Sequence, residues 1–143
     1  MEDIKSILSQ FHAKKSQESL KTVNDSARPP SAAPHSSEIP DMFFSEILSE
    51  FKLARIDIAV YLFLYTQVWS KPNLYRSHGI GPLNSYQGMS KELHFTQDEI
   101  LHSLKALENL SLIESVRAGQ YFVRKYFTES NDLKYGQDYD EFF

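Results

Sequence analysis

Residues 84–110 carry the pattern that most constrains this fold, because two short helices are predicted there with a tight turn between them. Asn84 is a good N-cap, so the first helix should cover 85–93. Thr96 and Glu99 form a capping box for a second helix over 96–110, in which each side chain satisfies a free backbone N–H. Apolar residues then recur at helical spacing and should be core: Ile100, Leu101, Leu104, Leu107 and Leu110.

A β-hairpin over 113–127 should follow these helices directly. Leu112-Ile113 opens the first strand, Ala118-Gly119 supplies the turn, and the alternation from Tyr121 to Phe127 predicts the returning strand. The order helix, turn, helix, hairpin can present one helix to a groove of DNA and the hairpin to the phosphate backbone.

Two further helices are predicted upstream, over 42–51 and over 53–70. The second is apolar nearly all round, and a helix of that kind is either deeply buried or covered by a partner. We therefore expect 42–70 to be the surface through which a homodimer would form. The buried face of the longer helix is expected to consist of Ile56, Ala59, Val60, Phe63, Leu64 and Val68.

The remaining parts of the chain differ in composition from this region. Residues 1–24 predict a short amphipathic helix, either a frayed end or a segment for docking or self-association, and 25–40 are rich in Ser, Ala and Pro, as in a disordered linker. The globular part should cover 41–128, and 129–143 should be a flexible acidic tail with aromatic residues. Four apolar residues share one face of the N-terminal helix: Ile4, Ile7, Leu8 and Phe11.

The region from Met89 onward resembles the winged helix-turn-helix of bacterial regulators. In that pattern Leu-Ala is replaced here by Met89-Ser90, and a turn Gly is replaced by His94. The pattern closes on Gly-Leu-Ile, and Ser111-Leu112-Ile113 stands in that place. The positions between them follow in register, namely Leu93, Phe95, Thr96, Ile100, Leu104 and Leu107.

The segment upstream is similar to the N-terminal domain of phage O-type and DnaD-type replication initiators. The resemblance rests on three stretches and covers about 39–127: Ile39-Pro40-Asp41-Met42-Phe43-Phe44, residues 53–65, and Val68-Trp69-Ser70-Lys71. It implies a mostly α winged helix with a small β-hairpin and flexible tails. It also implies a DNA-binding module of replication or transcription.

Contacts to DNA bases would come from the outer face of the helix over 96–110. We expect Gln97 to pair with an adenine edge and Lys105 to meet guanine or phosphate. Asp98 and Glu99 argue against DNA binding, because acids at the N-terminus of this helix suit its dipole but repel phosphates. The candidate contact residues are Thr96, Gln97, His102, Ser103 and Lys105.

The hairpin supplies the expected phosphate contacts. Arg117, Arg124 and Lys125, with Gln120 and Tyr121 near the tip, predict a small basic cluster. The leading hypothesis is therefore a protein that binds double-stranded DNA, a transcriptional regulator or a replication-associated factor.

A different class of function is the alternative, in which a winged helix serves as an adaptor that binds proteins. Its docking segments would be the N-terminal helix and the C-terminal tail, where acids steer a partner and aromatic rings provide buried anchors. The expected anchors in the tail are Tyr139, Phe142 and Phe143.

Charge and composition narrow these options. The formal net charge is −4, whereas a dedicated nucleic-acid binder is usually basic. The 143 residues include no cysteine, which excludes disulfides and thiolate chemistry and suits the cytoplasm. Because the longest apolar run, over 58–65, is far short of the ~20 residues that a membrane span needs, no membrane is expected. We see no motif of an enzyme, a metal site or a cofactor.

Overall fold

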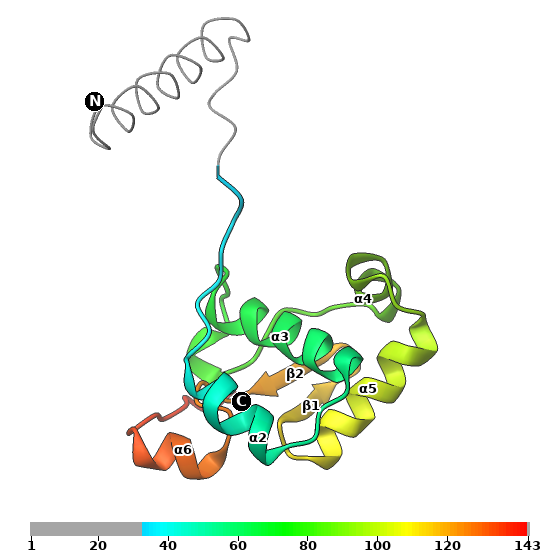
Figure 1. Cartoon of the computed structure of the whole chain (residues 1–143). Coiled ribbons are helices and arrows are strands. Elements are labelled where there is room, and N and C mark those ends of the chain that lie inside the picture. The colour runs from blue at the N-terminus through cyan, green and yellow to red at the C-terminus, as the bar shows by residue number, and fades with distance from the viewer. Residues whose placement is uncertain (1–32, 143) are drawn as a thin grey trace, which may run out of the picture. The chain divides into compact units, whose positions relative to one another are not determined.

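Helices account for most of the regular secondary structure, and a two-stranded antiparallel hairpin completes it (Figure 1). The computed structural model describes residues 33–142, and the unit discussed below begins at Ser37. This agrees with the predicted mostly α fold with a small β-hairpin. The elements are η1 (Phe43–Ile47), α2 (Leu48–Glu50), α3 (Arg55–Trp69), η2 (Arg76–His78), α4 (Tyr86–Leu93), α5 (Gln97–Asn109), β1 (Ile113–Arg117), β2 (Gln120–Val123) and α6 (Glu129–Lys134).

The helix α3 lies across the hairpin, with α4 and α5 at one end and α6 at the other (Figure 1). It begins two residues later than predicted, where the Ala54 N–H donates to the Asp57 carboxylate at 3.2 Å. Tyr61 and Tyr65 are buried, whereas Ile56, Ala59 and Phe63, expected on the buried face, are only half-buried. The apolar flanks of α3 are partly buried and pack against the same core, so the described part of this chain covers much of the helix. The homodimer remains a prediction, but the apolar surface of α3 no longer supports it.

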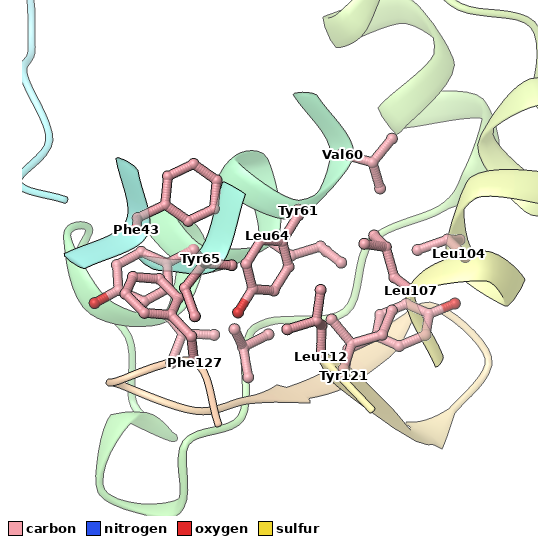
Figure 2. Packing of buried hydrophobic residues seen from close by; sticks show 14 of the residues in the cluster. Phe43, Val60, Tyr61, Leu64, Tyr65, Leu104, Leu107, Leu112, Tyr121 and Phe127 are labelled. Carbon is pink, nitrogen blue, oxygen red and sulfur yellow. The ribbon is translucent and has the colours of Figure 1, made fainter. Parts of the chain in front are cut away.

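Aromatic rings gather at one end of the core, whereas the other end is mainly aliphatic with the single ring of Tyr121 (Figure 2). Phe43, Tyr65 and Phe127 gather at one end, and Leu104 and Leu107 of α5 lie at the other (Figure 2). The Phe127 ring stacks on Tyr65 with 5.0 Å between centroids and lies 5.4 Å from the Phe43 ring. The short segment η1 is thereby fixed to the turn that follows the hairpin.

The hairpin is shorter than predicted, and a third segment extends the sheet. In its register Ile113 pairs with Val123 and Ser115 with Tyr121. The segment 79–81 pairs with the free side of β2: the Gly81 N–H donates to the Tyr121 carbonyl at 3.1 Å, and the Val123 N–H donates to the Gly79 carbonyl at 2.8 Å.

β2 ends at Val123, four residues before the predicted end at Phe127, because side chains take over the backbone groups there. The Trp69 indole donates to the Val123 carbonyl at 3.0 Å, and the Tyr65 hydroxyl donates to the Lys125 carbonyl at 2.8 Å. Phe127 then adopts a left-handed φ of 79°, which turns the chain toward α6.

The acidic segment after Phe127 is not the flexible tail that the sequence predicted. Thr128 caps α6 by accepting from the Asn131 N–H, and the chain then returns across the hairpin. Tyr139 lies edge-on to the Phe122 ring with 4.9 Å between centroids, and the Asp140 N–H donates to the Ser77 carbonyl at 2.9 Å. Residues 33–40 form no helix or strand, and the predicted helix over 1–24 lies outside the described residues.

Candidate nucleic-acid interface

A short turn at His94 to Thr96 joins α4 and α5, and each helix begins at a residue whose side chain caps it. The cap of α4 is Ser85, one residue after the predicted Asn84, because the Ser85 hydroxyl accepts from the Gly88 N–H at 2.9 Å. The capping box of α5 is confirmed: the Glu99 N–H donates to Thr96 Oγ1 at 3.1 Å, and the Thr96 N–H donates to Glu99 Oε1 at 3.0 Å.

Two residues adopt the left-handed conformation at the positions where the winged-helix pattern has glycine. His94 ends α4 with a φ of 60°, and Ser111 follows α5 with a φ of 61°. An L-residue with a Cβ pays roughly 1–2 kcal/mol for this conformation. Both residues therefore hold a backbone conformation that lowers the stability of the fold relative to glycine.

Replacing His94 or Ser111 by glycine should therefore stabilise the fold by about 0.5–1 kcal/mol each, because the relief of backbone strain exceeds the added freedom of the unfolded chain. Urea denaturation of the single variants measures this. Lys91→Gly is the control, since Lys91 is exposed inside α4, where glycine should cost about 1 kcal/mol. A loss of stability in all three variants would contradict the prediction.

The outer face of α5 contains only part of the predicted contact set. The side chains of Thr96, Gln97, His102 and Lys105 are exposed. Ser103 is 1% exposed, and its hydroxyl donates to Asp57 Oδ1 at 2.7 Å, so that it links α5 to α3. The assignment of Ser103 to base contact is wrong, because its hydroxyl is buried between two helices.

Gln120 and Tyr121 are also buried and brace the hairpin from within. The Gln120 side chain accepts from Arg117 Nε at 2.9 Å and donates to the Gly81 carbonyl at 3.1 Å. Burial raises the pKa of Tyr121, and a hydrogen bond with Tyr86 adds to the shift. These two residues hold the hairpin against the segment before α4, so we remove them from the proposed DNA contacts.

The three basic residues of the hairpin do not form the cluster that their sequence proximity suggested. Arg117 is exposed at the tip, whereas Arg124 and Lys125 follow Val123 at the other end of β2. Because a strand rises about 3.3 Å per residue, the hairpin itself separates them. The Arg124 guanidinium lies 5.1 Å from the Phe122 ring centroid, and Lys125 Nζ lies 5.8 Å from the Trp69 ring.

Arg124 forms an ion pair with a buried acid that no sequence pattern singles out. Asp132 of α6 is 2% exposed, and its Oδ2 lies 3.1 Å from Arg124 Nη1. The same carboxylate accepts from the Tyr139 hydroxyl at 2.6 Å and from the Tyr126 N–H at 3.1 Å. Burial, and then the hydrogen bond to Asp132, raise the pKa of Tyr139. Arg124 thus stabilises the fold, and the Asp132 carboxylate compensates its charge.

The residues predicted to bind a protein partner fall partly within this description. Tyr139 belongs to the Asp132 network, and the Phe142 ring lies 5.7 Å from the Tyr75 ring and 5.5 Å from the His78 ring. The other predicted anchors lie outside the described residues: Ile4, Ile7, Leu8, Phe11 and Phe143.

Within residues 33–142 no group of three or more His, Asp or Glu side chains is placed to hold a metal ion. No helix in the same range is long and apolar enough to cross a bilayer.

Comparisons of the chain with protein-family models, with curated proteins and with solved structures found no match. The geometry described above is therefore the basis for a functional proposal.

Proposed function

We propose that this chain is a winged-helix domain that docks on double-stranded DNA through the outer face of α5. The order of elements supports the winged helix: α3, the paired segment 79–81, α4, α5, then the hairpin of β1 and β2. In such a domain the second helix of the helix-turn-helix enters the major groove. A transcriptional regulator or a replication-associated factor would use the domain in this way.

The exposed polar face of α5 is the observation that carries the proposal. Gln97, His102 and Lys105 point away from the core on one helix, next to the capped turn. An amide and a cation are groups that pair with base edges and phosphates. Arg117 at the hairpin tip adds an exposed guanidinium. Of the ten residues that the sequence predicted, the proposal keeps these four. It leaves out Thr96, whose hydroxyl caps α5, and Lys125, which lies beyond the base of the hairpin, in addition to the four residues that serve the fold.

Binding through this face should be weak, and the affinity should fall only modestly as salt rises. Residues 86–109 contain two lysines and four acids, and Asp98 lies exposed in the first turn of α5. Two phosphate contacts give a slope of log K against log salt of only about −2. We therefore expect binding that is measurable at low salt and weaker near physiological salt.

Fluorescence anisotropy on random duplex DNA tests the proposal. Lys105→Ala and Arg117→Ala should weaken binding, whereas Asp98→Asn should tighten it about two- to fivefold, because an exposed charge pair contributes roughly 0.2–1 kcal/mol. Lys134→Ala and Asp138→Asn make the same changes of charge away from α5 and should leave the affinity almost unchanged. No binding at low salt, even with Asp98→Asn, would refute DNA binding.

The adaptor remains a second candidate, because acids rather than bases dominate the first turn of α5. Asp98 and Glu99 are both exposed there, and Arg124 is committed to Asp132. Large apolar side chains are also exposed away from α5, among them Leu133 and Phe44. Equal responses of Asp98→Asn and Asp138→Asn in the anisotropy assay would favour this candidate.

A further inference from the structure

A groove of about 500 Å³ runs beside β1, away from the exposed face of α5 considered above. Its apolar lining includes Phe51, Leu110 and Phe122. Leu110 is 38% exposed, and the two Phe side chains are half-buried. The groove therefore offers apolar surface that the described part of this chain leaves accessible.

The charges at this groove are mainly negative. Glu108, Glu114 and Glu129 line it, and none of the three forms an ion pair with any residue in 33–142. The one cation in the lining is Arg124, which is already paired with Asp132. A ligand of this groove would meet uncompensated negative charge around an apolar floor.

An unpaired strand edge borders the same groove. β1 pairs with β2 on one side, and no other described strand pairs with it. Ile113 and Glu114, at the start of β1, belong to the groove lining, so that the edge and the groove are continuous. An edge strand of this kind can accept an extended peptide through backbone hydrogen bonds, while neighbouring pockets take its side chains.

We infer that this groove is a docking site for an extended basic peptide of a partner protein. The peptide adds as a strand along β1, and its aromatic or large aliphatic side chains fill the apolar floor. Its Lys or Arg residues face Glu108, Glu114 and Glu129, which supply the charge complementarity. This inference goes beyond the proposed DNA binding, because it concerns other residues and another class of ligand.

A labelled nine-residue peptide with Lys and Phe in turn at its odd positions and Thr at its even positions is the probe, because alternate side chains of a strand share one face. The same peptide with Glu in place of Lys is its control. The full chain should bind the Lys peptide and not the Glu peptide. Glu114→Lys combined with Glu129→Lys should weaken binding roughly tenfold or more, because like charges then face each other. Both positions are exposed, so the variant should fold. Glu46→Lys combined with Glu92→Lys is the matched control outside the groove.

N-methylation of alternate backbone amides of the peptide tests the strand addition separately. One of the two alternating sets should abolish binding, since one set of N–H groups must face β1. Lys105→Ala should leave peptide binding unchanged, which separates this site from the DNA face. Equal affinity of the Lys and Glu peptides, or insensitivity to the groove variant, would overturn the inference. A dimer in sedimentation that only the groove variant dissociates would also overturn it, because the occupant would be a second copy.

Discussion

Asp132→Ala should lower the free energy of unfolding by about 3 kcal/mol, because removal of one partner leaves a partly buried charge without compensation. The carboxylate accepts from the Arg124 guanidinium, the Tyr139 hydroxyl and the Tyr126 N–H. Alanine deprives all three of their acceptor while the surrounding side chains still restrict water. Urea denaturation, followed by circular dichroism, measures the loss.

Asp138→Ala is the matched control for this prediction. Asp138 lies in the same acidic segment and is exposed, so its removal should change stability by less than about 0.5 kcal/mol. Tyr139→Phe removes only the hydroxyl that bridges Asp132 and the Lys125 N–H, at 2.6 and 2.9 Å, and should cost about 1–2 kcal/mol. Similar effects of the two Asp substitutions would show that the buried carboxylate does not hold the C-terminal segment.

The features that the sequence predicted well are those fixed by neighbouring residues. The capping box joins Thr96 and Glu99, which lie three positions apart, and the predicted turn uses the positive φ of Gly119, here 83°. Gly119 is also required at long range, because a Cβ there would collide with the Asn84 carbonyl oxygen. The sequence comparison placed His94 and Ser111 where the winged-helix pattern has glycine, and the local backbone at both residues suits glycine. Both adopt the left-handed backbone that glycine would adopt more readily.

The features that the sequence missed depend on partners far along the chain. Ser103 resembles any polar residue on a helix, and only its hydrogen bond to Asp57, 46 residues earlier, shows that it is buried. Gln120 is likewise fixed by the Gly81 carbonyl, 39 residues away. A polar side chain can be buried when it finds such partners, and periodicity alone does not record them.

The predicted basic cluster is wrong, because the prediction used the sequence positions of Arg117, Arg124 and Lys125 and not their places in the hairpin. Arg117 and Arg124 are seven residues apart in the sequence, but the hairpin sends one to its tip and the other beyond its base. The acidic composition of 129–143 was misleading in the same way. It gave no sign that Asp132 would be buried as the acceptor for Arg124. Charge composition therefore did not predict which charges lie at the surface, since Asp132 is buried and pairs with Arg124.

Phe43→Ala should destabilise the chain by about 3–5 kcal/mol, because it removes a fully buried ring from the aromatic end of the core. The Phe43 ring lies 5.4 Å from the Phe127 ring and 6.0 Å from the Tyr61 ring, so the cavity would open between η1 and α3. The neighbouring Phe44 provides the control, since it is 59% exposed and meets Phe43 edge-on. Phe44→Ala should cost less than about 1 kcal/mol. Denaturant unfolding compares the two variants directly. If their effects were equal, η1 would not be packed against Tyr61 and Phe127 as the ring contacts indicate.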